Sequence, residues 1–254
     1  MDLGQGVLLG GGGILAGAVN AAAGGGSLIS YPALLGAGLP ALAANVTNTV
    51  ALCPGYLGGL RGFRRQLEGP EQRARLRRLT PVSVIGAGIG VVLLQASSTH
   101  TFRDIVPWLI LFACALFGVQ PLITRRLVAR RTAEGQAELR AGALAAQGAT
   151  SAYGAYFGAA AGVIMLASLG LAIDDDLARI NAIKSWLQLV MNGCAAIAFV
   201  FISPVRWVEV AVLAPCALIG GRTGAALSLR IPATLLRAGV TVCGVTVALV
   251  LLLT

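Results

Sequence analysis

Long apolar stretches separated by short polar segments dominate this chain. An apolar run of about 20 residues can cross the hydrocarbon core of a bilayer as a helix, and the runs here are too numerous for one to be a cleaved signal peptide. The pattern predicts eight hydrophobic units, at approximately 3–39, 41–60, 80–96, 105–124, 141–172, 179–202, 207–228 and 232–253. Glycines interrupt the first and the fifth unit. The sequence therefore predicts an all-α, polytopic membrane protein.

Composition and charge support the same fold class. Apolar residues make up 57% of the chain and charged residues 11%, against about 25% charged residues in soluble proteins. A net charge of +9 suggests nucleic-acid binding in a soluble protein, but the arginines lie in short loops between apolar segments, where they indicate topology. The five cysteines fall within apolar segments without metal-type spacing. We therefore expect a lipid bilayer as partner, and no nucleic acid, metal or cofactor.

Two loops are strongly basic and indicate the orientation of the chain. The loop over 61–78 holds seven arginines against two glutamates, and the loop over 122–140 holds five arginines. Basic loops stay on the cytoplasmic side of a membrane, which places both loops in the cytoplasm. The intervening loop over 97–104 then lies outside.

The two halves of the chain repeat the same order of units. Each opens with an interrupted unit, continues with a helix that carries asparagines near its start, and ends with two plainer helices, so that Asn45–Asn48 aligns with Asn181–Lys184. If the interrupted units are hairpins, three crossings remain in each half and the second half is inverted; if each crosses once, the halves are parallel. Arg222, Arg230 and Arg237 cluster at the last connection and favour the inverted arrangement, which places them inside. Chance similarity between Gly- and Ala-rich helices is the alternative.

No separate soluble domain fits between these units. We expect a first transmembrane repeat over 1–124, a basic cytoplasmic linker over 125–140 and a second transmembrane repeat over 141–254. The sequence leaves the oligomeric state open, with a homodimer as one candidate assembly.

Lys184 is the only lysine of the chain, and it lies in an apolar segment. A charged side chain at membrane depth costs about 2.5 to 3.5 kcal/mol on insertion scales, unless it meets a counter-charge, water or a ligand. All ten acidic residues fall in loops or at segment ends, so none is expected to pair with it near the bilayer centre. Neighbouring amide donors favour binding of an anion over loss of the proton. The segment is therefore expected to form an anion site.

The first interrupted unit contains Gly24, Gly25 and Gly26 in succession, between Asn20 and Ser27. Each glycine weakens a helix by about 1 kcal/mol relative to alanine, so the helix is expected to break there. Where it restarts, with Ser27 as its N-cap or neighbour, its free N–H groups and positive dipole end would attract an anion. Close packing of small residues between helices is the alternative interpretation.

The second interrupted unit has Gly154, Gly158 and Gly162 four residues apart, a less pronounced break signal than a run of glycines. Tyr156 could offer a hydroxyl donor there, or act as a packing residue. Arg222 lies near the predicted cytoplasmic end of its segment, where its long side chain can reach the interface or serve as a gate.

Polar residues line one face of the predicted helix over 179–202. They are Asn181, Lys184, Gln188 and Asn192, spaced by three, four and four residues. Residues at this spacing share one helix face, and a polar face this long is expected to line a cavity. Asn45 and Asn48 form a shorter matching stripe in the first half. Hydrogen bonds between helices are the alternative role for the asparagines.

Several motifs occur in a fixed order. The first half carries Ala16-Gly17-x-x-Asn20-x-x-Ala23-Gly24-Gly25-Gly26-Ser27-Leu28-Ile29-x-x-Pro32, then Ala44-Asn45-x-Thr47-Asn48 and Pro54-Gly55. The second half carries Gly154-x-Tyr156-Phe157-Gly158-x-x-x-Gly162, Arg179-x-Asn181-Ala182-x-Lys184, Asn192 and Leu235-Leu236-Arg237. This ordered set spans nearly the whole chain and resembles the TauE/SafE family of bacterial sulfite and organosulfonate exporters.

The resemblance implies secondary transport, not enzymatic activity. The implied substrate is a small sulfur-containing anion, such as sulfite, sulfoacetate or a related C2 sulfonate, carried out of the cytoplasm; the resemblance does not choose among these. With the repeat, it predicts alternating access around a site near the midplane. The expected substrate-binding residues are Lys184, Asn20, Gly24, Gly25, Gly26, Ser27, Asn45, Asn48, Tyr156, Asn181, Gln188 and Asn192, with Arg222 as a gating residue.

Two other classes of function fit less well. A passive anion channel would share the cationic site but would show no saturation at low concentration. An intramembrane enzyme or assembly factor is disfavoured because the sequence predicts no nucleophile–base pair or metal-ligand cluster at membrane depth.

Overall fold

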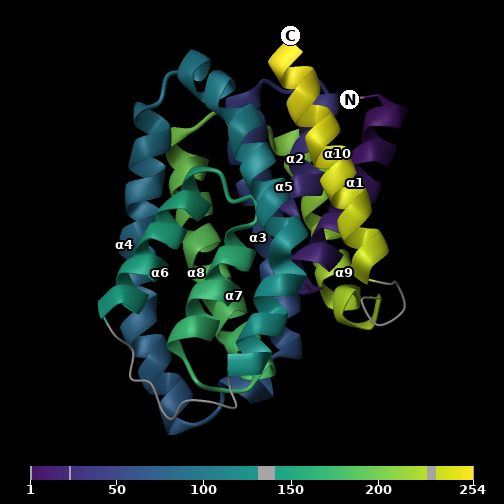
Figure 1. Ribbon diagram of the computed structural model, residues 1–254. Helices are drawn as coiled ribbons and strands as arrows, with labels where there is room; N and C mark the ends of the chain where they lie inside the picture. The colour runs from purple at the N-terminus through teal and green to yellow at the C-terminus, as the bar shows by residue number, and fades with distance from the viewer. Residues whose placement is uncertain (1, 23, 131–140, 228–232, 254) are drawn as a thin grey trace.

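The computed structural model describes residues 2–22, 24–130, 141–227 and 233–253, and these form an all-α bundle (Figure 1). The helices are α1 (Leu3–Ala22), α2 (Ser27–Gly36), α3 (Ala41–Gly62), a 3-10 turn at Arg64–Leu67, α4 (Pro70–Ala96), α5 (Thr99–Arg130), α6 (Ala141–Tyr156), α7 (Ala161–Ala172), α8 (Leu177–Ile202), α9 (Trp207–Leu227) and α10 (Ala233–Leu253). The predicted fold class is confirmed. Most of the predicted basic linker and Arg230 lie outside the described residues.

The bundle is apolar outside and partly polar inside, as a lipid-embedded protein must be. Ile85, Val92 and Phe201 are 65%, 66% and 81% exposed, whereas Lys184 and Gln147 are fully buried. Among the described residues, four helices are long and apolar enough to cross a membrane: Leu3–Ala21, Pro70–Ala96, Thr99–Arg126 and Leu177–Ile202. The protein is therefore a membrane protein with several apolar helices.

Two helices extend beyond their predicted bounds. α4 begins at Pro70 instead of near 80, and α5 runs from Thr99 to Arg130 instead of from 105 to 124. The extra turns at the start of α4 and at the end of α5 contain arginine and leucine, which are good helix formers, and proline is favoured in the first turn of a helix, where α4 has it. The predicted bounds enclosed only the apolar part of each helix, because they were set by apolar run length. The polar turns that continue the same helix were therefore missed.

The first interrupted unit is a hairpin. The side-chain amide of Gln5, at the start of α1, donates to the carbonyl oxygen of Ala37, just after the end of α2, at 3.2 Å. The two helices also pack against each other along their length. The unit therefore enters and leaves at one end of the bundle (Figure 1).

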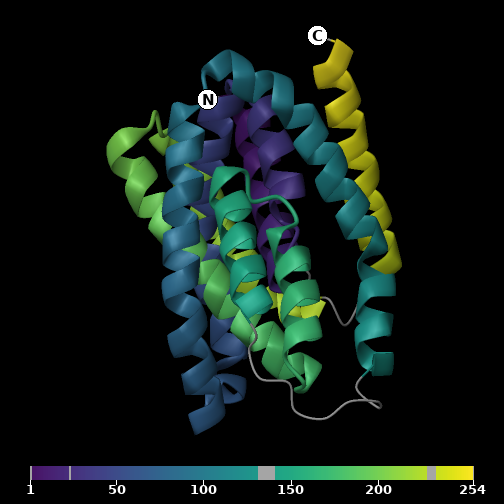
Figure 2. The ribbon, with the colours of Figure 1, turned by 60° about the vertical axis from the view of Figure 1, so that its left-hand side comes forward.

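The second interrupted unit is also a hairpin, and it opens at the other end (Figures 1 and 2). α4 and α6 run in the same direction, because Gly86 lies against Gly148 and Gly90 against Ala152. Asp175, just after α7, contacts the first turns of α4. The start of α6, the end of α7 and the start of α4 therefore lie at the same end of the bundle. We call this the basic end, after the arginines in the first turns of α4, and the other the opposite end.

Helices from the two halves are interleaved. α4 of the first half packs mainly on α6 and α8 of the second, while α9 of the second half packs mainly on α1 and α3 of the first. The same correspondence continues in α5, which packs on α7, and α10, which packs on α2; α5 and α10 also lie side by side (Figure 2). We call α1, α2, α3 and α9 the first group, and α4, α6, α7 and α8 the second group. This pairing supports the predicted inverted repeat, whose symmetry stays a prediction.

Glycines bring the backbones together within each group. A Cβ atom added to Gly17 of α1 would lie 2.2 Å from the carbonyl oxygen of Ala217 in α9, and one added to Gly90 of α4 would lie 2.2 Å from that of Ala152 in α6. Small residues four apart allow this approach in membrane helices, where packing has no hydrophobic driving force.

We expect Gly90→Val to destabilise the bundle by about 1–3 kcal/mol or more, because the larger side chain would push α4 away from α6. Gly88→Val, two residues along, is the matched control, since no described heavy atom lies within 4 Å of its added Cβ. Thermal unfolding in detergent compares the two variants. Equal melting temperatures would contradict the close contact of α4 and α6.

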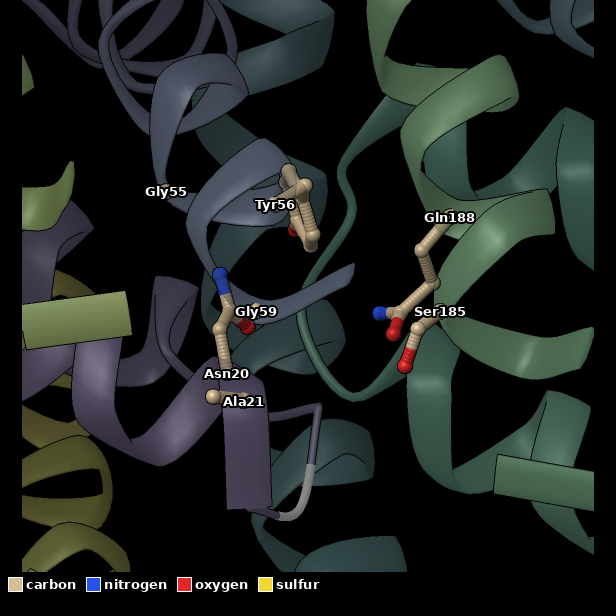
Figure 3. Close-up of a pocket in the computed structure, with 7 residues that line it drawn as sticks. All are labelled: Asn20, Ala21, Gly55, Tyr56, Gly59, Ser185 and Gln188. Atoms are coloured by element: carbon tan, nitrogen blue, oxygen red, sulfur yellow. The ribbon is translucent and has the colours of Figure 1, made fainter. Parts of the chain in front are cut away.

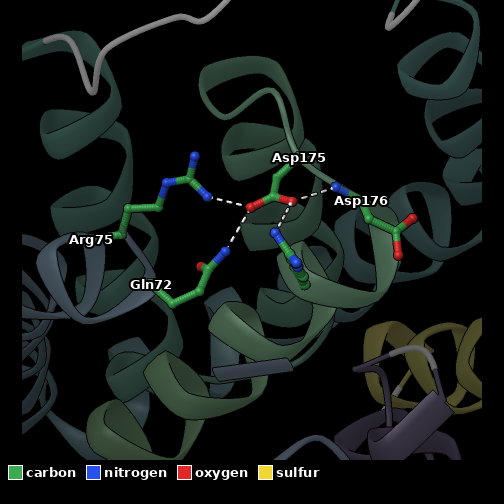
Figure 4. A network of polar contacts seen from close by, with 5 residues as sticks. Gln72, Arg75, Asp175 and Asp176 are labelled. Carbon is green, nitrogen blue, oxygen red and sulfur yellow. Dashed lines mark hydrogen bonds and ion pairs between the residues drawn. The ribbon is translucent and has the colours of Figure 1, made fainter. Parts of the chain in front are cut away.

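A polar network closes the basic end within the second group (Figure 4). The Asp175 carboxylate accepts from Arg75, from the Gln72 amide at 2.6 Å and from the Asp176 N–H at 2.8 Å, and it pairs with Arg179 at 3.4 Å. Burial alone would raise the pKa of Asp175, but the hydrogen bonds from Asp176, Arg75 and Gln72 and the charge of Arg75 outweigh it, so this pKa lies below its ordinary value of 3.8.

Because the pKa of Asp175 is lower in the folded state, the network stabilises the fold above pH 3.8, and that contribution is lost as the pH falls through the folded-state pKa. We expect Asp175→Asn to lower the melting temperature in detergent near neutral pH and to have little effect in strong acid. Asp174→Asn, at an exposed neighbour, is the control. An Asp175→Asn effect of the same size at both pH values would show that the charge is not what stabilises this end.

Candidate functional site

The first hairpin turns at its glycines, and Asn20 shapes the turn. Gly24 has φ of +79°, a left-handed conformation that favours glycine. The N–H of Gly24 donates to the carbonyl oxygens of Val19 and Asn20, and the N–H of Gly26 donates to Asn20 Oδ1 at 2.8 Å. Two of the three glycine amides thus have acceptors within the turn and are not open to a ligand. α2 then begins at Ser27, with Gly26 as its N-cap.

The second hairpin also breaks as predicted. α6 ends at Tyr156 and α7 begins at Ala161, with Gly158 at φ +81° and Ala160 at φ +57°. The hydroxyl of Tyr153 donates to the carbonyl oxygen of Ala159 at 2.8 Å and holds this irregular segment in place.

The two turns meet inside the bundle. A Cβ atom added to Gly24 would lie 2.7 Å from Cα of Gly162, and one added to Gly162 would lie 2.7 Å from Cα of Gly24 and 2.6 Å from Nε2 of Gln188. The rings of Tyr31 and Phe157 also touch, with centroids 5.3 Å apart. Gln188 of α8 therefore lies where both hairpins converge.

A small cavity opens beside this junction, between α1, α3 and α8 (Figure 3). Its lining surrounds about 220 Å³ of space when the part that opens outward is included, but the enclosed interior is only about 10 Å³, roughly the room that one water molecule needs. Its lining residues are Asn20, Ala21, Gly55, Tyr56, Gly59, Ser185 and Gln188. All are neutral, and several offer N–H or O–H donors. The cavity lies between the first and the second group.

Lys184 lies on α8 directly before Ser185, and its side chain is 0% exposed. Its Nζ has no hydrogen-bond partner and no ion pair among the described residues. Lys184 is not part of the cavity lining, and it lies about 6 Å closer to the basic end than Gln188, which is near the middle of α8. An enclosed ammonium without a counter-charge is strongly unfavourable, which leaves this position in need of an anion.

The other polar residues of α8 divide between two environments. Gln188 lines the cavity, and the side-chain amide of Asn192 donates to the carbonyl oxygen of Gln188 at 2.9 Å. Asn181 is only partly buried, near the start of the helix. The predicted polar face thus exists, but only its middle reaches the cavity.

Three other predicted site residues hold the hairpins to their neighbours. Asn45 Nδ2 donates to the carbonyl oxygen of Tyr156 at 2.8 Å, and Asn48 Oδ1 accepts from the hydroxyl of Ser30 at 2.5 Å. The hydroxyl of Tyr156 lies 3.2 Å from that of Ser97, at the opposite end. In this conformation they join helices, which was the alternative role for the asparagines.

Gly25 and Arg222 also lie outside the cavity lining. A Cβ atom on Gly25 would lie 2.5 Å from the ring of Phe117, so Gly25 is a packing position against α5. Arg222 of α9 is exposed, and its Cγ would lie 3.3 Å from a Cβ on Gly58, one residue from the cavity wall at Gly59. A gating role for Arg222 stays a prediction.

The sequence interpretation missed Tyr56 and Ser185, which both line the cavity. Tyr56 is buried, and its hydroxyl lies near the side chains of Asn20 and Asn192. A signal was present, since Tyr56 continues the Asn45 and Asn48 stripe at helical spacing and so extends it to the length of the stripe on α8.

Two broken hairpins that meet at membrane depth beside a small polar cavity are typical of secondary membrane transporters. Comparison with known proteins agrees. The family described as "Sulfite exporter TauE/SafE" matches residues 9–251, nearly the entire chain. The chain therefore belongs to the TauE/SafE family of membrane transporters, which is not a class of enzymes.

Two relatives carry similar descriptions. The chain is 26% identical over 218 residues to "Probable membrane transporter protein YfcA" of Escherichia coli strain K12, covering 85% of this chain and 78% of that protein. It is 26% identical over 228 residues to "Probable membrane transporter protein" of Haemophilus influenzae, covering 89% of this chain and 86% of that protein. No solved structure matches the chain.

Proposed function

We propose that this chain exports a small sulfur-containing anion, such as sulfite, sulfoacetate or a related C2 sulfonate, across the bacterial inner membrane. The observation that carries the proposal is Lys184, a fully buried ammonium without a partner among the described residues. Membership of the sulfite exporter family supports a sulfur-containing anion as its counter-charge. The neutral donors of Asn20, Tyr56 and Gln188 supply hydrogen bonds in place of water.

The interleaved packing supports alternating access as the mechanism of the proposed transport. Close backbone contacts at Gly17 and Gly90 hold helices together within each group. Between the groups, Gly24 and Gly162 also meet closely at the hairpin turns, and the cavity lies beside that contact. We infer that the first group rocks against the second, and that α8 moves relative to α3 so that an anion in the cavity reaches Lys184. The moving bodies are then not the two halves of the sequence but the two groups.

The membrane potential suffices to drive export. An anion that leaves a cell with a positive exterior gains about 2.3 kcal/mol per charge per 100 mV. Flux in reconstituted vesicles should therefore rise with an imposed potential of that sign. Flux that ignores the potential would remove this driving force from the proposal.

A binding screen tests the proposal. Sulfite, sulfoacetate, taurine, thiosulfate, sulfate and chloride are titrated into the purified protein by calorimetry. We expect at least one sulfur-containing anion to bind more tightly than chloride. If none does, the proposed substrate class is wrong.

Measurements of flux against substrate concentration distinguish a transporter from a passive channel. The flux through a transporter saturates with substrate, whereas a channel conducts without saturation at low concentration.

A further inference from the structure

One buried positive charge in the described part of the bundle has no counter-charge. Among the described residues, two side chains of charged type are buried, those of Lys184 and Glu209. Glu209 pairs with Arg206 at the opposite end, at 3.3 Å, and Asp175 pairs with Arg75 and Arg179 at the basic end. Of these groups, Lys184 is the one without a counter-charge among the described residues.

Asn20 presents a second unpaired donor at the cavity. Its Oδ1 accepts the N–H of Gly26, which fixes the orientation of the amide and makes the other atom Nδ2. Nδ2 is buried without a hydrogen-bond partner among the described residues, and Asn20 lines the cavity. The Tyr56 hydroxyl lies near this amide but does not meet hydrogen-bond geometry with it, so a ligand could provide the acceptor that this buried donor needs. The amide adds a hydrogen bond but no charge.

We propose that Lys184 and Asn20 select singly charged anions and reject doubly charged ones. One anionic charge beside the ammonium gives a neutral pair, whereas a second charge would stay uncompensated in a low-dielectric interior. The accepted ligands are then monovalent sulfonates and the hydrogensulfite form of sulfite. Sulfate and fully ionised sulfite are rejected, and sulfoacetate, a dianion, is removed from the candidate substrates named above. This inference rests on the proposed function, in which Lys184 binds the transported anion.

The test compares probes that differ in charge. Methanesulfonate, sulfate and sulfoacetate are titrated into the purified full chain by calorimetry, and we expect methanesulfonate to bind at least tenfold more tightly than either dianion. Sulfite is titrated across the pH range in which hydrogensulfite loses its proton. Above that transition the apparent affinity for sulfite should fall about tenfold per pH unit further than the affinity for methanesulfonate, which keeps its single charge over the same range and therefore controls for any titration of the protein.

Asn20→Asp is the matched variant. It keeps the oxygen that accepts from Gly26, so the turn is retained, and it replaces the free donor with an acceptor that carries negative charge. We expect at least a tenfold loss of methanesulfonate affinity, because the new carboxylate repels the anion. Unchanged affinity in this variant would show that Asn20 does not bind the anion.

Three results separate this inference from the proposed function. A tenfold preference for methanesulfonate supports both. Dianions that bind as tightly as methanesulfonate would overturn charge selection and leave the transport of sulfur anions standing. Failure of every sulfur-containing anion to bind would overturn the proposed function and this inference together.

Discussion

Replacing Lys184 with alanine is expected to lower the affinity for a bound sulfur-containing anion at least about 30-fold, or about 2 kcal/mol, because the anion then loses its buried counter-charge. Arg126→Ala is the matched control, since it removes an exposed cation from α5. Calorimetric titration of both variants against the wild type measures the change. Equal losses in the two variants would point to a general effect of net charge, not to a site at Lys184.

The same position should show opposite effects on stability and binding. Lys184 is fully buried and unpaired in the empty protein, and a buried charge that lacks its partner destabilises a fold by about 3–5 kcal/mol. We therefore expect Lys184→Met to raise the melting temperature of the empty protein while it abolishes binding. A variant that loses both stability and binding would indicate that Lys184 has a structural partner.

A crosslink between the two groups is expected to abolish transport. Gly59 of α3 and Ser185 of α8 line opposite sides of the cavity, so a short bifunctional reagent between cysteines at these positions would hold the groups together. Gln95 of α4 and Ser203 after α8 lie within the second group, with their side chains 3.2 Å apart, and a link there should leave most transport intact. Both pairs are introduced into a chain without its five native cysteines.

Sulfite flux in reconstituted vesicles, before and after reduction of a cleavable linker, gives the comparison. Recovery after cleavage shows that the loss comes from the link and not from the cysteine substitutions, and unchanged anion binding in the linked protein shows that the link restrains motion without blocking the cavity. Full transport with α3 linked to α8 would contradict rocking of the groups. Loss of transport with α4 linked to the end of α8 would instead assign α4 to the moving interface.

The sequence predicted the elements of the fold well, because apolar run length and glycine breaks are local properties. The run from Gly24 to Gly26 predicted the first turn, and Gly158 lies in the second. The interleaving of α4 and α9 could not be predicted in this way. Their contacts depend on which small residues of distant helices meet, as Gly90 meets Ala152, and in lipid no apolar stripe marks such a surface.

The candidate site could be predicted only in part. Lys184 was evident because a lone charge in an apolar run has few explanations, and Gln188 followed from its helical spacing. The roles of Asn45 and Asn48 depend on which acceptor or donor each side chain finds, Tyr156 and Ser30 respectively, and spacing does not specify this. A polar stripe thus indicates an interior face without separating ligand-binding residues from those that join helices.

The single lysine permits the most direct test of the anion site. Protein grown with lysine labelled at Cε with carbon-13 gives one side-chain NMR signal, from Lys184 alone. Titration with methanesulfonate should shift this signal saturably, with the affinity measured by calorimetry. A signal that stays in place while the anion binds would show that the anion occupies a site away from Lys184.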